Sequence, residues 1–208
     1  LSHQVVTEGM WGVSYKRPVT RTSEYLDGLL PLLNGQQVSA AGDLLTTRGA
    51  LSMQDIPTPP VYLAALGPKM LGVAGSRTAG TVTWMTGPKT LRDHIVPTLR
   101  AAAVGAGRAE SDVRTVAMLP VSVTENVDGA RESAATQFAL YDSLPSYKAM
   151  LDREGFSGPA DTAIVGDEAT VADRIRELSD YGVDEYVGIL FDTDPEVRAR
   201  TRALLRSL

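Results

Sequence analysis

The stretch 61-VYLAALGPKMLGVAGSRTAGTVTW-84 decides the predicted fold class. Residues 61–66 form an apolar run typical of a buried strand, and Gly67-Pro68 follows where a helix would begin. Residues 69–75 have helical spacing, and residues 81–85 are rich in β-branched side chains. A strand, a helix and a second strand in this order predict two parallel strands joined by a helix.

The same alternation continues to the end of the chain, which predicts an α/β fold with a parallel sheet of four strand–helix units. The further strands are expected at 113–124 and 183–191. The further helices are expected at 90–107, 129–141, 145–155, 168–182 and from Pro195 to about residue 205.

Several helix ends carry local signals. Asn126 or Asp128 is a suitable N-terminal cap for one helix, and Asp167 for another. Gly182 suits a left-handed C-terminal position, and Pro97 predicts a kink in the helix at 90–107.

The N-terminal part of the chain has a different character. Residues 24–33 form an amphipathic helix pattern, and residues 35–60 have the pattern of a hairpin or a long excursion that ends at 57-PTPP-60. Insertions of this length often carry substrate contacts.

Composition excludes several classes of function. The chain of 208 residues has a net charge of −5 and no Lys/Arg run, which argues against nucleic acid or an anionic membrane as a partner. It contains no cysteine, so it has no disulfide, thiolate metal site or cysteine nucleophile, and this composition is compatible with a cytoplasmic protein. With two histidines, no metal site is expected, and no apolar run approaches the ~20 residues of a membrane span.

Four strand–helix units do not close a barrel, which usually takes roughly 250 residues. The first residues, 1-LSHQVVTEGMW-11, have no initiator Met and resemble neither a signal peptide nor a natural start. The chain is therefore expected to be a piece of a longer protein, with a smaller open α/β sheet as the alternative.

Several motifs carry a family resemblance: 61-VYLAALGPKMLGVAGSRTAGTVTWMTGP-88, with 2-SHQ-4, 15-YKRP-18, 24-EYL-26 and 164-IVGDEATVADRIRELSDYGVDEYV-187. Together they resemble luciferase-like monooxygenases, and within that superfamily the oxidoreductases that use coenzyme F420, a deazaflavin. The resemblance implies a (β/α)8 TIM barrel of which this chain is the C-terminal half. Residues 1–60 would hold the loop, helix and insertion after strand four, and residues 61–208 strands five to eight, all in a single domain. It also implies a homodimer, and the exposed sheet edges would require another chain.

The turn after the first predicted strand is the main candidate for cofactor binding. Its small residues allow a ring or a phosphate to approach the backbone, and the amides of the following helix attract negative charge. In the family the matching residues line the deazaflavin or its phosphate-bearing tail. The alternative is a tight connection that only starts a helix. These residues are Ala64, Ala65, Leu66, Gly67 and Pro68.

Two other strand ends are weaker cofactor candidates. Thr86 and Gly87 offer a hydroxyl and backbone amides, although a plain helix cap explains them equally well. Gly166 precedes a helix near the cofactor face of the family, but no GxGxxG or Walker pattern surrounds it. Trp84 lies near the rim and is a candidate substrate contact, with a buried core position as the alternative.

His3 matches a position where related enzymes carry an acid/base residue that faces the reacting ring. An imidazole titrates near neutrality, which suits proton transfer coupled to hydride transfer. Trp11 and Tyr15, in the loop expected at residues 8–18, are candidate substrate contacts. His94 is expected to be an ordinary surface residue.

Tyr141 and Tyr147 flank 142-DSLPS-146, which is either a lid or a surface helical hairpin.

The resemblance implies an oxidoreductase that transfers a hydride between F420 and a small organic substrate. One alternative is an FMN-dependent monooxygenase that uses reduced flavin and oxygen. Another is a non-catalytic flavin-binding or interaction protein derived from a shortened barrel.

Overall fold

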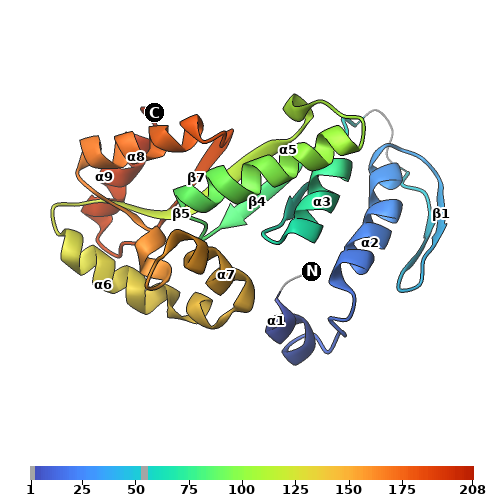
Figure 1. Ribbon diagram of the computed structural model, residues 1–208, viewed down its shortest axis with the longest axis horizontal. Coiled ribbons are helices and arrows are strands. Elements are labelled where there is room, and N and C mark those ends of the chain that lie inside the picture. Colours follow the sequence, from blue (N-terminus) through green and yellow to red (C-terminus); the bar gives the residue numbers. More distant parts are fainter. Residues whose placement is uncertain (1–2, 53–55) are drawn as a thin grey trace. The chain divides into compact units, whose positions relative to one another are not determined.

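The computed structural model describes residues 3–52 and 56–208 of the chain. The chain forms two compact units, Leu1–Val61 and Tyr62–Leu208. Figure 1 shows the helices and strands of both units along the sequence.

The C-terminal unit is an α/β structure built on a five-stranded sheet with the order β3-β4-β5-β6, in which β7 also pairs with β5. All four strand pairings are parallel, which confirms the fold class. The strands are β3 (Tyr62–Ala64), β4 (Gly80–Trp84), β5 (Arg114–Val123), β6 (Ile164–Gly166) and β7 (Glu185–Leu190). The α-helices are α3 (Pro68–Arg77), α4 (Pro88–Thr90), α5 (Val96–Gly105), α6 (Val127–Phe138), α7 (Pro145–Glu154), α8 (Glu168–Asp180) and α9 (Pro195–Leu205).

The prediction of four strands was one strand short. Strand β6 has three residues, Ile164–Gly166, which is too short to show an alternating pattern in the sequence. It pairs with the last three residues of β5, so it extends the sheet only at the end of that strand.

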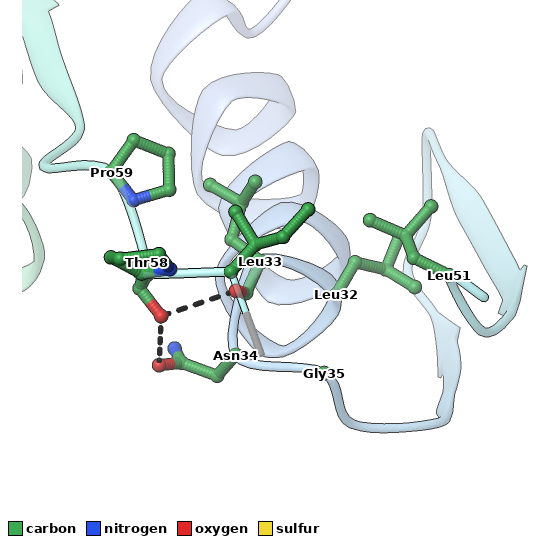
Figure 2. A pocket seen from close by; sticks show the side chains of 9 residues that line it. Leu32, Leu33, Asn34, Gly35, Leu51, Thr58 and Pro59 are labelled. Carbon is green, nitrogen blue, oxygen red and sulfur yellow. Dashed lines mark hydrogen bonds between the residues drawn. The ribbon is translucent and has the colours of Figure 1, made fainter. Parts of the chain in front are cut away.

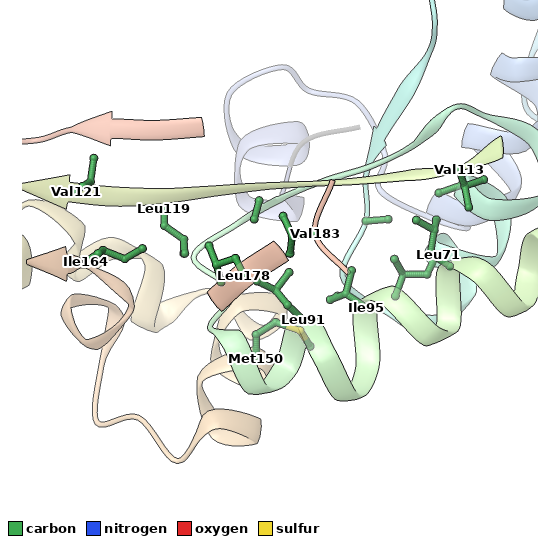
Figure 3. Close-up of a cluster of buried hydrophobic side chains, with 14 of the residues drawn as sticks. Leu71, Leu91, Ile95, Val113, Leu119, Val121, Met150, Ile164, Leu178 and Val183 are labelled. Carbon is green, nitrogen blue, oxygen red and sulfur yellow. The ribbon is translucent and has the colours of Figure 1, made fainter. Parts of the chain in front are cut away.

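The main core lies between the sheet and the helices. Odd-numbered residues of β5, including Leu119 and Val121, point into a buried cluster with Leu71 of α3 and Leu99 of α5. Figure 3 shows how side chains from β5 and from the helices meet in this layer. Helices α3 and α5 lie side by side in Figure 1 and together supply much of it.

Gly80 is required where β4 begins. Its φ angle is +144°, and a Cβ atom there would lie 1.9 Å from the carbonyl oxygen of Arg114, its partner on β5. Any side chain would therefore force the two strands apart.

A π turn precedes Pro97, where a kink was predicted. Residues 88–105 form one helix in which Leu91–Ile95 has π geometry, and the amide of Val96 donates to the carbonyl of Leu91. Pro97 has no amide hydrogen for the carbonyl four residues earlier, and its ring crowds that carbonyl. One extra residue in the turn before Pro97 relieves the conflict.

The predicted helix ends are confirmed. The Asp167 carboxylate accepts the Thr170 amide at 2.8 Å, and the Asn126 side chain accepts the Gly129 amide at 3.1 Å. Gly182 has a φ angle of +85° beyond the end of α8.

The N-terminal unit consists of α1 (Gln4–Gly9), α2 (Pro18–Leu33) and an antiparallel hairpin of β1 (Val38–Ala41) and β2 (Thr46–Gly49). The hairpin prediction is confirmed. The loop expected from residue 8 was wrong in its first two residues, which complete α1. The Glu24 carboxylate of α2 accepts the amides of Asp43, Leu44 and Leu45 and so ties the hairpin turn to the helix.

The packing of α5 gives a direct test of the core. Leu99 is fully buried, whereas Val104 on the same helix is 54% exposed. We expect Leu99→Ala to lower the free energy of unfolding by about 2–5 kcal/mol and Val104→Ala to change it by less than about 0.5 kcal/mol. Urea denaturation of both variants checks this. Equal losses in the two variants would contradict the described core.

Candidate active site

Because the five strands of the C-terminal unit are parallel, their carboxyl ends meet at one edge of the sheet. Alpha/beta barrels place their active sites at this edge. One turn leaves it toward a helix after each of the five strands. Three of these turns lie at residues 64–68 after β3, at residues 85–87 after β4 and between Gly166 and α8. They contain all the residues that were predicted to contact the cofactor.

Hydrogen bonds of Thr81 hold the turn after β3, and part of this turn is exposed to solvent. The Thr81 hydroxyl lies 3.3 Å from the Ala65 amide and 3.0 Å from the Leu63 carbonyl, so it fixes the end of the strand. Ala65 is buried, whereas Ala64, Gly67 and Pro68 are exposed.

Helix α3 begins at this turn without a side-chain cap. Gly67 is its N-cap, with φ −82° and ψ 152°, and a Cβ atom there would meet no atom within 4 Å. In the part of the chain that the structure describes, the amides of Gly67, Lys69 and Met70 donate to no protein group. Exposed amides at a helix N-terminus attract anions, and the exposed Lys69 adds a positive charge. The turn therefore fits a phosphate.

His94 is the main correction to the sequence analysis. It is not a surface residue: its side chain is only 7% exposed, and its Nε2 lies 2.8 Å from the carbonyl oxygen of Leu66. His94 lies on the buried face of its helix with Leu91 and Ile95, and its hydrogen-bond partner is 28 positions away in the sequence.

The turn after β4 is occupied by groups of the chain itself. Thr86 is fully buried, and its hydroxyl donates to the Trp84 carbonyl at 3.2 Å. The carboxylate of Glu154 accepts the Thr90 amide at the start of the following helix. A Cβ atom on Gly87 would lie 2.5 Å from this carboxylate, so the glycine makes room for Glu154. Sequence reasoning missed Glu154, which is 64 positions from its partner.

Met85 lies in this turn with a φ angle of +53° and no exposed surface. Left-handed backbone is uncommon in residues other than glycine and concentrates at functional sites. The second cofactor candidate thus lies on a tightly built, strained turn.

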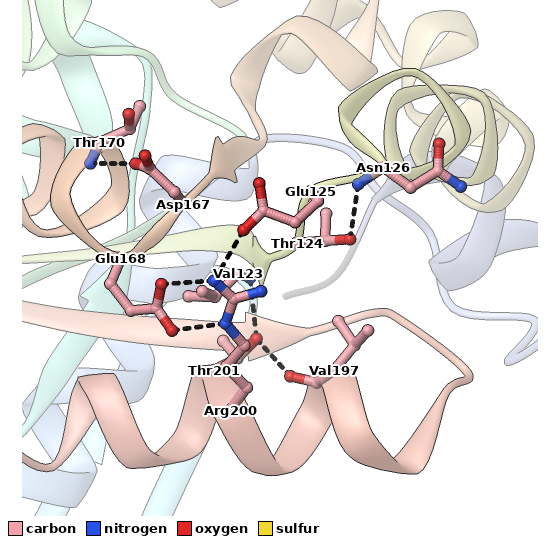
Figure 4. Close-up of polar contacts among 10 residues, drawn as sticks. All are labelled: Val123, Thr124, Glu125, Asn126, Asp167, Glu168, Thr170, Val197, Arg200 and Thr201. Atoms are coloured by element: carbon pink, nitrogen blue, oxygen red, sulfur yellow. Dashed lines mark hydrogen bonds and ion pairs between the residues drawn. The ribbon is translucent and has the colours of Figure 1, made fainter.

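The turn before α8 is also filled. Gly166 is buried, its carbonyl accepts the Thr124 amide, and a Cβ atom there would lie 2.9 Å from the Thr170 side chain. Figure 4 shows the carboxylates around this helix start: Asp167 on the Thr170 amide, and Glu168 on Arg200 of α9.

Arg200 also bonds to Glu125 at 3.0 Å, which links the end of β5 to α8 and α9. Its neighbour Thr201 accepts the Val123 amide at 2.9 Å. Among the three turns with predicted cofactor residues, the turn at residues 64–68 differs from the other two: no carboxylate of the described residues bonds to the first amides of its helix.

Trp84 lies in an aromatic cluster beside the strand ends. Its ring packs edge-on against Phe138 and Tyr141, with ring centroids 5.7 Å and 5.8 Å apart. The ring centroids of Tyr141 and Tyr147 are 5.1 Å apart. Both tyrosines therefore point into this cluster, and burial raises the pKa of Tyr147 to about 12. The buried Trp84 Nε1 has no hydrogen-bond partner among the described residues. This N–H is a donor that a ligand group can satisfy.

His3, Trp11 and Tyr15 belong to the N-terminal unit, whereas the strand-end turns belong to the C-terminal unit. His3 is the N-cap residue of α1 and is half-buried, Trp11 is 58% exposed, and the Tyr15 amide donates to Glu8 at 3.0 Å.

The long insertion of the N-terminal unit forms an open groove of about 350 Å³. Figure 2 shows its lining, with the Thr58 hydroxyl 3.2 Å from both the Leu33 carbonyl and the Asn34 side chain. Leu51 and Ile56 add exposed apolar surface to it.

The part of the chain that the structure describes contains neither a candidate metal site nor a candidate membrane span. Residues 3–52 and 56–208 contain no group of three or more His, Cys, Asp or Glu side chains that could hold a metal ion. No helix in these ranges is long and apolar enough to cross a membrane.

The environment of His3 predicts its titration. Partial burial lowers the pKa of His3 because desolvation penalises the charged imidazolium. We expect the midpoint to fall below the ordinary value of about 6.5, so that the imidazole is neutral at pH 7 and able to accept a proton. An NMR titration of the two histidine rings, assigned with His3→Gln, measures it. A midpoint at or above about 6.5 would contradict this environment.

Comparisons with known proteins agree with this architecture. The family model described as "Luciferase-like monooxygenase" matches residues 2–185. The chain is 30% identical over 156 residues to a 5,10-methylenetetrahydromethanopterin reductase from Methanolobus tindarius, covering 74% of this chain and 47% of that protein. It thus spans about half the length of this curated relative.

Two solved structures are similar in fold. An F420-dependent secondary alcohol dehydrogenase, in complex with an F420–acetone adduct, has a TM-score of 0.76 at 18% identity, over 96% of this chain and 66% of that chain. EDTA monooxygenase from Chelativorans sp. BNC1 has a TM-score of 0.71 at 16% identity, over 100% and 64%. The chain has the luciferase-like TIM-barrel type of fold and is shorter than these neighbours. It belongs to the luciferase-like monooxygenase family.

Proposed function

We propose that this chain carries the cofactor-binding strand ends of an F420-dependent oxidoreductase, which transfers a hydride between the deazaflavin and a small organic substrate. The observation that carries the proposal is the turn at residues 64–68. It combines exposed, unpartnered amides with small residues at the carboxyl edge of a parallel sheet, in a chain of this family.

The cofactor itself supplies the hydride chemistry. Gly67, Lys69 and Met70 would hold the tail phosphate with their amides, and Ala64 and Ala65 would leave room for the rest of the cofactor. At Thr86–Gly87 and at Gly166, carboxylates of the protein already bond to amides of the following helix, which favours the α3 turn as the phosphate position. The turns at Thr86–Gly87 and Gly166 would then shape the site. The Trp84 Nε1, which has no hydrogen-bond partner among the described residues, would donate to a substrate oxygen.

His3 would accept or deliver the proton that accompanies hydride transfer, because a neutral imidazole at pH 7 is a competent base. Trp11 and Tyr15, from the same unit, would border the substrate.

F420 is favoured by the similarity in fold to an F420-dependent alcohol dehydrogenase that is seen with an F420–acetone adduct. The second candidate is an FMN-dependent monooxygenase, and the similarity in fold to EDTA monooxygenase favours its monooxygenase reaction. Both cofactors carry a phosphate, so the turn at residues 64–68 would bind either of them in the same way.

A titration separates the two cofactors. We expect F420 to bind, with a change in its absorbance or fluorescence, and FMN to bind more weakly. Tight binding of FMN with no response to F420 would overturn the F420 assignment in favour of the monooxygenase.

Substitutions at Gly67 test the phosphate position. Its backbone angles suit any residue and its Cβ position is open, so Gly67→Ala, Gly67→Asn and Gly67→Asp should all fold. Asn and Asp both cap the helix amides, but only Asp adds a negative charge. We expect affinity near wild type for Ala, a moderate loss for Asn, and for Asp a further loss of about tenfold.

The comparison of Asp with Asn isolates the charge, because the two side chains have nearly the same shape. If all three variants bound the cofactor as wild type does, the phosphate would lie elsewhere.

A further inference from the structure

A buried histidine holds the backbone of the candidate cofactor turn. His94 Nε2 lies 2.8 Å from the Leu66 carbonyl oxygen, and the side chain is 7% exposed. A carbonyl oxygen can only accept a hydrogen bond, so Nε2 carries the hydrogen and donates it. The contact joins the helix that follows β4 to the turn that follows β3, 28 positions apart.

His94 lies on the buried face of the helix that follows β4. Within Leu91–Ile95, the side chains of Leu91, His94 and Ile95 are buried. Arg92 and Asp93 remain exposed and pair with each other at 2.6 Å. His94 therefore shares the buried face of the helix with two core residues, which lie three positions before it and one position after it.

The hydrogen bond also fixes where the next amide points. A trans peptide is planar, so the C=O of Leu66 and the N–H of Gly67 point in opposite directions, and the described chain has no cis peptide bond. With the carbonyl held toward His94, the Gly67 amide is directed away from the buried imidazole. Gly67 and Lys69 lie on the exposed side.

Gly67 leaves this peptide free to rotate unless something holds it. A flip of the Leu66–Gly67 peptide would turn the φ angle of Gly67 from −82° to a positive value, which glycine adopts without cost. The flipped turn would present the Leu66 carbonyl in place of the amide and would repel an anion. It would also leave no acceptor for the buried His94 donor.

We propose that His94 is a positioning residue for the anionic group of the cofactor. Its hydrogen bond to Leu66 locks the peptide in the orientation that presents the Gly67 amide to the ligand. This inference rests on the proposed function of the turn at residues 64–68.

The test uses two substitutions at His94 and measures F420 affinity. His94→Leu removes the donor, and we expect it to weaken binding about tenfold, since the peptide can then flip. His94→Gln retains an N–H donor and should bind within a few-fold of wild type.

A second substitution separates positioning from a general loss of packing. Gly67→Ala fits the present backbone but disfavours the positive φ of the flipped form. We expect His94→Leu to weaken F420 binding much less in the Gly67→Ala background than in the wild-type background, so that Gly67→Ala restores most of the affinity that His94→Leu loses.

A measurement without cofactor keeps the two proposals apart. NMR coupling constants of Gly67 report its φ angle, and we expect a single negative value in wild type and averaging with positive values in His94→Leu. An unchanged φ in His94→Leu, or a loss of affinity that Gly67→Ala does not restore, overturns the role of His94. If wild type shows the expected φ but does not bind F420, the proposed function fails and the backbone lock stands.

Discussion

Strand β5 is the element on which the C-terminal unit depends, because β4, β6 and β7 all hydrogen-bond to it. Its odd-numbered side chains fill the core against the helices, and its last residues also bond to Thr201 of α9. Since every pairing is parallel, this one strand aligns the carboxyl ends of the others. The turns that leave these ends are thereby brought to one edge, where family members place their chemistry.

The three turns that contain the predicted cofactor residues differ in one respect that matters for function. At two of them the chain supplies its own carboxylates to the helix amides, through Glu154 at Thr90 and through Asp167 at Thr170. At the start of α3 no side chain caps the amides, and the N-cap is a glycine with open space around it. A helix start that is left uncapped and exposed has room for an external anion. The Thr81 and His94 side chains form hydrogen bonds with the backbone of the turn that leads into this helix.

Sequence reasoning succeeded where the determining chemistry is local. The caps at Asn126 and Asp167 and the left-handed Gly182 follow from side chains within three residues of the helix ends, and the structure confirms them. Strand β6 was missed because three residues show no period. His94 was placed wrongly because a polar ring suggests a surface position, and its acceptor, the Leu66 carbonyl, lies 28 positions away in the sequence.

The candidate site likewise has local features that the sequence suggested and long-range contacts that it did not. The turn at residues 64–68 was identified from its small residues and from the family resemblance. Its supports were not, because Thr81 and His94 act across 16 and 28 positions, and Glu154 acts across 64. Contacts of that range depend on the packing of several elements, which a single sequence does not reveal.

The central claim is that the start of α3 receives the cofactor phosphate. A crystal structure of the protein with F420 bound tests it most directly. We predict that the phosphate oxygens lie within hydrogen-bonding distance of the Gly67 and Lys69 amides, with Glu154 still bonded to Thr90. A phosphate bound instead at Thr86–Gly87 with Glu154 displaced, or at the start of α8, would contradict the claim.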